Sequence, residues 1–244
     1  MNNKLLNTIL LMLFPHKCFY CGKVLADEGY VCEQCVSIIP YTGEELCPIC
    51  GKQEEDCLCQ QAPTAYDGCT SALFYTREAA YGIHRYKYEG KSYYADYLAK
   101  LMAEKFSLRY GDTPIDLITY VPMHKTKRKQ RGFCQTKLLA DRLAQKLEIL
   151  LDDSILVNTG RGNVQMEQHS LKARQENVKI SFKLAKGASV SEKTVLLVDD
   201  VLTTGSTLNR CAALLKKAGA REVYCITAAV TRKKEKKAAG SGEC

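Results

Sequence analysis

The sequence predicts an α/β protein, in which a small cysteine-rich, zinc-binding unit precedes an open, mainly parallel sheet flanked by helices. Eight of the 13 cysteines lie between Cys18 and Cys59. After residue 65, strand-like segments alternate with helix-length segments, which is typical of α/β domains. Two long apolar segments, 194–200 and 222–230, are joined through one helix-length segment. Such a pair predicts a parallel βαβ unit.

We expect three parts, namely an N-terminal helix with a double zinc ribbon at 1–62, the α/β domain at 66–231 and a basic tail at 232–244. The opening apolar run is too short to span a bilayer and lacks a small-residue cleavage site. It predicts a short amphipathic helix packed on the core, without stable membrane insertion. Because no secretory signal is present, we expect a cytoplasmic protein whose cysteines bind metal rather than form disulfides.

The α/β domain is expected to follow a regular order of strands and helices. The segments with strand patterns are 69–76, 115–122, 194–200 and 222–230. The segments with helical spacing are 94–111, 135–149 and 206–220. Glycines close the first and last of these helices, and Pro122 ends the second strand.

The clustered cysteines have the spacing of zinc ligands, because C-x2-C places two thiolates on one turn. Sequential pairing predicts one ion bound by Cys18, Cys21, Cys32 and Cys35 and a second bound by Cys47, Cys50, Cys57 and Cys59. Interleaved pairing, or one occupied site, remains an alternative. Four thiolates leave no open position for catalysis, so the zinc is expected to be structural. Two such sites would add −8 from thiolates and +4 from zinc, changing the formal net charge of +8 to about +4.

Two adjacent carboxylates, Asp199 and Asp200, come at the end of a predicted strand, directly before "VLTTGST". Ligands of open α/β sheets bind beyond the carboxyl ends of the strands, and a helix N-terminus favours phosphate. A Walker loop is excluded, because no lysine follows Gly205 and the "GKS" at 90–92 lacks both the earlier glycine and a preceding strand. A plain helix cap is the alternative for a single threonine, but it does not account for the whole segment.

The thirteen residues 195–207 resemble the 5-phosphoribosyl-1-pyrophosphate (PRPP) binding motif of type I phosphoribosyltransferases. The resemblance implies that fold, with the two acids as catalytic residues that bind the ribose hydroxyls. It also implies that Mg²⁺ neutralises the pyrophosphate. The implied PRPP-binding residues here are Asp199, Asp200, Val201, Leu202, Thr203, Thr204, Gly205, Ser206 and Thr207.

Over nearly the whole chain, the order of motifs resembles the ComF family of competence-associated, amidophosphoribosyltransferase-like proteins. These motifs are the paired cysteines, "IHRYKYEG", "VPMHKTKRKQRGFCQ", "RQENVKISF" and the PRPP motif. The resemblance implies a loop with Lys87 and Tyr88 at the pyrophosphate, and a flexible basic segment that closes the site, with Arg131 on phosphate. It also implies a role in DNA uptake during natural transformation, with other DNA-processing proteins as partners.

Two functions are therefore expected as alternatives. The first is a phosphoribosyltransferase of unknown acceptor. The second is a single-stranded DNA-binding processing factor, regulated by PRPP without turnover. Basic residues interleaved with tyrosines suit a single strand. The expected nucleic-acid contacts are Lys125, Lys127, Arg128 and Lys129.

The chain departs from the family pattern at two places. Cys134 stands where the family usually has asparagine in R-G-F-N-Q, and a thiol is the weaker hydrogen-bond donor. The segment around Gln168 and Arg174 is shorter than the usual form. His169 in that segment is expected to be an exposed histidine rather than a general base.

Overall fold

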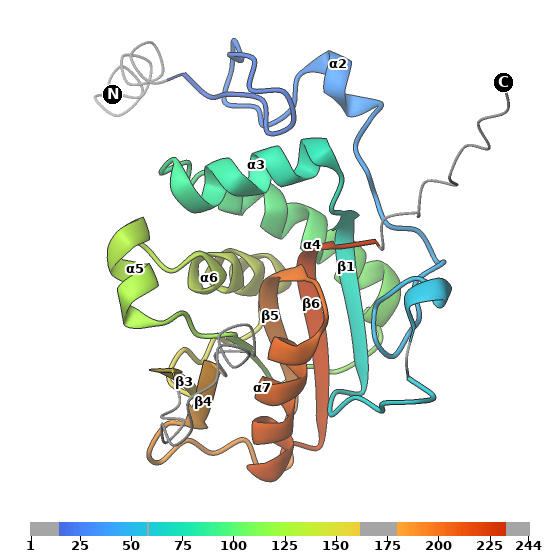
Figure 1. The fold of residues 1–244 in the computed structure, drawn as a ribbon, viewed down its shortest axis with the longest axis vertical. Coiled ribbons are helices and arrows are strands. Elements are labelled where there is room, and N and C mark those ends of the chain that lie inside the picture. Colours follow the sequence, from blue (N-terminus) through green and yellow to red (C-terminus); the bar gives the residue numbers. More distant parts are fainter. Residues whose placement is uncertain (1–14, 58, 162–179, 233–244) are drawn as a thin grey trace, which may run out of the picture.

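In the computed structural model, which describes residues 15–57, 59–161 and 180–232, a four-stranded sheet lies between helices (Figure 1). Its strand order is β1-β6-β5-β2, and all three neighbouring pairs are parallel. The strands are β1 (Gly68–Phe74), β2 (Leu117–Tyr120), β5 (Thr194–Leu202) and β6 (Glu222–Val230). The predicted parallel βαβ unit is confirmed, because β5 and β6 pair directly along their length and α7 (Ser206–Lys217) connects them in the chain.

Helices cover both faces of the sheet. On one face, α4 (Tyr94–Tyr110) and α6 (Gln135–Leu147) bury Leu98, Met102 and Leu139 in a shared core. On the other face, α7 packs Leu208 and Leu215 against the strands. These three helices match the predicted segments. Helices α6 and α7 each bury one apolar stripe, whereas α4 is buried around most of its circumference.

Several elements have no counterpart among the predicted ones. Helix α3 (Arg77–Tyr88) begins at Thr76, whose side chain accepts a hydrogen bond from the N–H of Ala79. It lies across the carboxyl ends of the strands (Figure 1). The short helix α5 (Lys125–Arg131) precedes α6. The strands β3 (Leu156–Arg161) and β4 (Ile180–Leu184) form a separate antiparallel pair.

The first zinc ribbon, which includes the short helix α2 (Glu33–Val36), packs on α3 and α4. The ring of Phe19 is fully buried and lies 5.1 Å from that of Tyr94. Arg85 of α3 is also buried, and its Nη1 donates to the carbonyl of Cys18 at 3.0 Å. The first ribbon and the sheet domain therefore share one core.

The second ribbon, which includes the 3-10 helix η1 (Glu54–Asp56), lies along the outer side of β1 (Figure 1). The N–H of Cys69 in β1 donates to the carbonyl of Pro48 at 3.3 Å. Leu46 of this ribbon is buried in the same core as Tyr66 and Phe74. The second ribbon is therefore also packed on the sheet domain.

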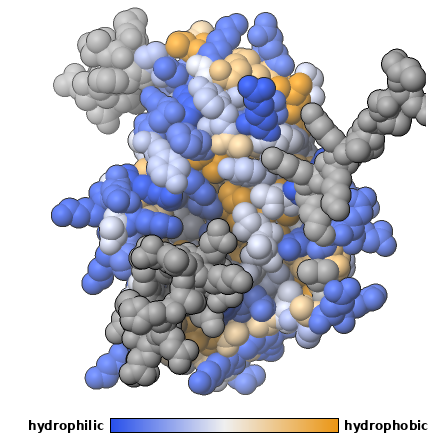
Figure 2. Space-filling view, in the orientation of Figure 1, coloured by the Kyte–Doolittle hydropathy of each residue, from blue (hydrophilic) through white to orange (hydrophobic). Residues whose placement is uncertain are grey.

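Some expectations fall outside the described residues, among them the N-terminal helix within 1–14, His169 with its neighbours, and the tail beyond Arg232. In the described part of the chain, no helix combines the length and the apolar character needed to cross a membrane. Figure 2 shows hydrophilic side chains over the region of α5, in agreement with the absence of buried residues from that helix.

Candidate functional site

Two groups of four cysteines bring their sulfur atoms together. The groups are Cys18, Cys21, Cys32 and Cys35, and Cys47, Cys50, Cys57 and Cys59. Within each group all Sγ atoms lie within 4.8 Å of one another, and pairs such as Cys50–Cys57 lie 3.7 Å apart. A tetrahedral zinc site with Zn–S bonds of about 2.3 Å requires S···S distances of about 3.8 Å. The residues therefore fit zinc, with the sequential pairing that the sequence predicted.

The two ribbons hold their first C-x2-C pair on the same kind of turn. In the first, the N–H of Cys18 donates to the carbonyl of Lys23 at 2.7 Å. In the second, the N–H of Cys47 donates to the carbonyl of Lys52 at 2.7 Å. Gly22 and Gly51 have φ values of 80° and 69°, which side chains rarely adopt. All four ligands of each site are thiolates, so the sites suit structural zinc.

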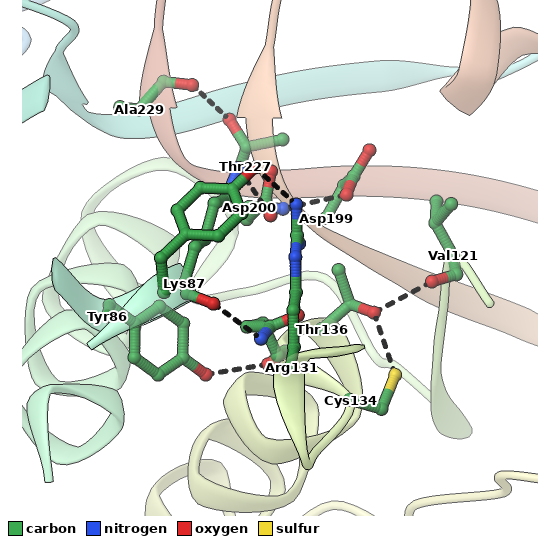
Figure 3. A network of polar contacts seen from close by, with 12 residues as sticks. Tyr86, Lys87, Val121, Arg131, Cys134, Thr136, Asp199, Asp200, Thr227 and Ala229 are labelled. Atoms are coloured by element: carbon green, nitrogen blue, oxygen red, sulfur yellow. Dashed lines mark hydrogen bonds and ion pairs between the residues drawn. The ribbon is translucent and has the colours of Figure 1, made fainter. Parts of the chain in front are cut away.

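The acid pair lies near the carboxyl end of β5, which continues two residues beyond the predicted end, to Leu202. The N–H of Asp200 donates to Oδ1 of Asp199 at 2.8 Å. Nζ of Lys87 lies 2.7 Å from Oδ2 of Asp200. Figure 3 shows Lys87 and Arg131 converging on this acid pair from outside the sheet. The site therefore combines two carboxylates with cations from separate elements.

The two acids differ in their electrostatic surroundings. Burial and then the neighbouring charge of Asp200 raise the pKa of Asp199 to about 8, although the N–H of Asp200 and the ammonium of Lys87 act in the opposite direction. Burial disfavours a charged carboxylate, and a like charge adds to that effect. Asp200 in contrast has the ion pair with Lys87. Near neutral pH the pair can therefore hold one proton on Asp199.

The loop after β5 leads directly into α7. Gly205 is the N-cap residue, with φ of 81° in the left-handed region. The hydroxyls of Thr204 and Ser206 are 2.7 Å apart, and both residues are exposed. The first N–H groups of a helix lack partners within the helix and favour an anion. Thr203 to Thr207 thus offer hydroxyls and N–H groups on an exposed turn.

Lys87 and Tyr88 lie in the last turn of α3, not in a loop as the sequence predicted. The prediction was wrong because it came from the family resemblance and not from the segment's own pattern, which buries Ile83 and Tyr86 on one face of a helix. Nη2 of Arg131, at the end of α5, donates to the hydroxyl of Tyr88 at 2.6 Å. The guanidinium also lies 4.5 Å from the centre of the Tyr88 ring. The structure therefore brings Lys87, Tyr88 and Arg131 to one side of the acid pair.

Gln135 and Tyr86 join these segments, and the sequence did not single them out. The fully buried Gln135 accepts from Nη1 of Arg131 at 3.1 Å and donates through Nε2 to the carbonyl of Lys87 at 3.2 Å. The hydroxyl of Tyr86 donates to the carbonyl of Gln135 at 2.7 Å. The position of Gln135 directly after "RGFC" is the sequence signal that could have identified it. Gln135 holds the end of α3 and the start of α6 together at the site.

Cys134 is the N-cap residue of α6, where its side chain makes no capping hydrogen bond. Its Sγ lies 3.4 Å from Oγ1 of Thr136, which in turn donates to the carbonyl of Val121 at 2.8 Å. Thr136 therefore links α6 to the end of β2. The thiol itself contributes a weak contact.

The basic segment, which the family resemblance implied to be flexible, forms the helix α5. All four of its expected nucleic-acid contacts are exposed, namely Lys125, Lys127, Arg128 and Lys129. The ring of His124 caps the helix, accepting through Nδ1 from the N–H of Thr126 at 3.4 Å. Gly132 ends it in the left-handed region, with φ of 79°. The helix thus carries a cluster of exposed positive charge, and Arg131 at its end reaches Tyr88 at the site.

Both parts of the chain match families of known proteins. Residues 9–70 match the double zinc ribbon domain, and residues 137–241 match the phosphoribosyl transferase domain. The DNA utilization protein YhgH of Escherichia coli K12 is 29% identical over 227 residues, covering 88% of this chain and 98% of that protein. These matches confirm the predicted combination of a type I phosphoribosyltransferase fold with a zinc-binding unit.

Two further relatives carry names that refer to competence. Competence protein F of Haemophilus influenzae is 28% identical over 229 residues, covering 88% of this chain and 96% of that protein. Competence protein ComFC of Streptococcus pneumoniae is 26% identical over 230 residues, covering 85% and 96%. The similarity therefore extends through both domains.

Proposed function

We propose that this chain is a ComF-type competence protein, because its double zinc ribbon precedes a phosphoribosyl transferase domain and both parts match the competence relatives. In this proposal it binds PRPP with Mg²⁺ and acts in DNA uptake in the cytoplasm. One observation carries the proposal. The acid pair Asp199–Asp200 lies directly before the Gly205 turn and faces Lys87. A ribose carrying a phosphate at one end and a pyrophosphate at the other suits this order of groups.

The acid pair is proposed to bind the ribose. Carboxylate oxygens accept hydrogen bonds from the 2- and 3-hydroxyls, and they stabilise the positive charge that develops at the anomeric carbon during transfer. Asp200 is paired with Lys87 before the ligand arrives. Binding of the hydroxyls to Asp200 would release the ammonium of Lys87, which is then available to the pyrophosphate.

The turn from Thr203 to Thr207 is proposed to bind the 5-phosphate. The first N–H groups of α7 and the hydroxyls of Thr204 and Ser206 are donors to phosphate oxygens. The absence of a side chain at Gly205 lets the backbone come close to the anion, and its φ of 81° suits glycine. Val201 and Leu202 complete the end of the strand.

Lys87, Tyr88 and Arg131 are proposed to bind the pyrophosphate. They come from α3 and α5, and the hydrogen bond from Arg131 to the Tyr88 hydroxyl already joins the two helices. Mg²⁺ would neutralise the pyrophosphate charge, held mainly by ligand oxygens and water with Asp199 and Asp200 as the nearest protein carboxylates. Movement of α5 toward the ligand would exclude water from the activated sugar.

Calorimetric titration with PRPP and Mg²⁺ tests the proposal. We expect binding by the wild type and its loss in the double variant Asp199→Asn, Asp200→Asn. The matched control replaces another adjacent pair, Asp152 and Asp153, which lies in a turn before β3. Failure of the wild type to bind at millimolar PRPP would overturn the proposal. Release of pyrophosphate on addition of a nitrogenous acceptor would establish turnover.

A second function is supported by the exposed charge of α5. Here the chain binds single-stranded DNA for processing, alongside other DNA-processing proteins, and PRPP regulates it without turnover. Exposed cations beside the site would contact the phosphates of a strand. The variant to test replaces Lys125, Lys127, Arg128 and Lys129 by alanine.

Binding to a labelled single strand, measured at several salt concentrations, distinguishes this function. We expect the α5 variant to bind more weakly and with a smaller dependence on salt than the wild type. A control variant neutralises four exposed lysines elsewhere, Lys100, Lys146, Lys186 and Lys193. Equal losses in the two variants would contradict a specific role of α5.

A further inference from the structure

The second zinc ribbon places a lysine beside the turn that we propose for the 5-phosphate. Nζ of Lys52 donates to the backbone carbonyl of Thr204 at 3.2 Å, across a separation of 152 residues in the chain. The turn from Thr203 to Thr207 has hydroxyls and N–H groups but no cationic side chain of its own. A cation for this end of the site therefore comes from another domain.

The backbone of Lys52 is held by the zinc-binding turn itself. Its carbonyl accepts from the N–H of Cys47 at 2.7 Å, and the N–H of Gly51 donates to the carbonyl of Cys47 at 2.9 Å. Gly51 also lies against β1, since a Cβ there would come within 3.0 Å of the carbonyl oxygen of Cys69. The turn is thus fixed between the four cysteines on one side and the sheet on the other.

The first ribbon provides an internal comparison. Its C-G-K motif ends in Lys23, which has the same backbone hydrogen bond, here from the N–H of Cys18. That turn lies against α3 instead of β1, because a Cβ at Gly22 would come within 3.0 Å of the hydroxyl of Tyr81. Lys23 is exposed, whereas Lys52 is partly buried. The same local motif therefore has different surroundings in the two ribbons.

The ammonium of Lys52 retains the capacity to bind an anion. A lysine has three donors, and the bond to the Thr204 carbonyl uses one of them. In the part of the chain that the structure describes, the acceptor found for Lys52 is this carbonyl and no carboxylate pairs with it. A phosphate bound at the adjacent N–H groups would be the natural partner of this charge.

We propose that Lys52 is part of the 5-phosphate site, so that the second zinc ribbon completes the PRPP-binding surface of the other domain. The inference rests on the proposed function, because it assigns the phosphate end of that same site. The proposal also implies that the second zinc site affects the binding of PRPP. By fixing the turn that carries Lys52, the metal sets the affinity for the 5-phosphate without taking part in any chemistry.

Calorimetry with ribose 5-phosphate, PRPP with Mg²⁺, and inorganic pyrophosphate tests this assignment. We expect Lys52→Met to bind the two ligands with a 5-phosphate about 10-fold more weakly, as for loss of one charged hydrogen bond. Binding of pyrophosphate should be unchanged. The effect should decrease at high salt, because Lys52 is only partly buried. Lys52→Arg keeps the charge and should retain most of the affinity.

The control is Lys23→Met, which makes the same change in the first ribbon and should bind all three ligands like the wild type. Zinc content and melting temperature establish that each variant is folded. A wild type that binds none of the ligands overturns the proposed function. If the wild type binds and Lys52→Met binds equally well, or loses pyrophosphate to the same extent, the assignment of Lys52 alone is overturned.

Discussion

Nζ of Lys87 lies 2.7 Å from Oδ2 of Asp200, which joins the last turn of α3 to the carboxyl end of β5. The two side chains are only 18% and 17% exposed. Removing one partner of such a pair leaves the other charge poorly solvated. The pair also keeps the charge of Asp200 balanced while Asp199 lies directly beside it. The contact therefore contributes both to stability and to the state of the site before ligand binds.

Lys87→Met is expected to lower the free energy of unfolding by about 1–3 kcal/mol, because it leaves Asp200 unpaired. The same change in a protein that already carries Asp200→Asn should cost less. Urea unfolding of the two single variants and the double variant measures this coupling. Lys137→Met, in the half-exposed pair with Asp153, should cost less than about 1 kcal/mol. Additive effects of the Lys87 and Asp200 changes would contradict the prediction.

The raised pKa of Asp199 predicts a pH dependence of stability. From an ordinary value of 3.8, burial and then the charge of Asp200 raise it to about 8. Between these values the folded protein holds a proton that the unfolded chain releases, so stability contributed by this group is present below pH 4 and lost as the pH rises toward 8.

Asp199→Asn should remove that dependence. Between pH 5 and pH 8 the variant should lose less stability than the wild type, by about 2 kcal/mol, since the residue keeps some solvent exposure. Urea unfolding at several pH values across this window provides the measurement. If the free energy of unfolding changed equally with pH in the two proteins, Asp199 would have an ordinary pKa and the prediction would be wrong.

Two zinc ions per chain are expected, and single cysteine variants should each lose one. Cys18 is fully buried beside Phe19, whereas Cys47 is partly exposed. We therefore expect Cys18→Ser to lower the melting temperature more than Cys47→Ser, while metal analysis finds about one ion in each. One ion in the wild type, or two in either variant, would contradict the sequential assignment of the sites.

The sequence predicted the centre of the fold well because its signals are local. An apolar run buried on both faces identifies β5 with its acid pair, and an amphipathic pattern identifies α7 after the glycine turn. The spacing of the cysteines likewise predicted the two groups of four whose sulfur atoms lie close together. In each case the residues that define the feature are close in the chain.

The missed features depend on contacts between distant segments. Helix α5 buries none of its residues, so it has no apolar stripe to detect. Helix α3 is polar and contains Gly82, whose place in a helix is explained only by the ring of Phe19 in the first ribbon. The contact between Lys52 and Thr204 requires the second ribbon to lie along β1. No local pattern in the sequence encodes these packings.

Gly82 should tolerate no larger residue. Alanine inside a helix ordinarily gains about 1 kcal/mol over glycine, but a Cβ here would overlap the buried ring of Phe19. We expect Gly82→Ala to lower the free energy of unfolding by about 1–3 kcal/mol, as for overpacking of a core. Thermal and urea unfolding measure the loss. Adding Phe19→Leu should recover part of it, and a Gly82→Ala protein as stable as the wild type would contradict the contact.

Cys134 offers the opposite case, a position where a substitution should stabilise the protein. It caps α6 with φ and ψ of −96° and 108°, the extended conformation of an N-cap residue, yet its side chain makes no capping bond. Asparagine at an N-cap accepts a hydrogen bond from the N–H two or three residues later, which is worth about 1 kcal/mol. Cys134→Asn should therefore raise the free energy of urea unfolding by about that amount.

Cys134→Ala is the matched control, because it removes the thiol and adds no acceptor. The weak contact of the thiol with Thr136 makes us expect a change of less than about 0.5 kcal/mol for this control. A gain with asparagine and none with alanine would assign the effect to the cap of α6. Because Gln135 of α6 binds both the Lys87 carbonyl and Arg131, a more stable α6 should also hold Arg131 more firmly at the site. Equal stability of the asparagine and alanine variants would show that the cap contributes nothing.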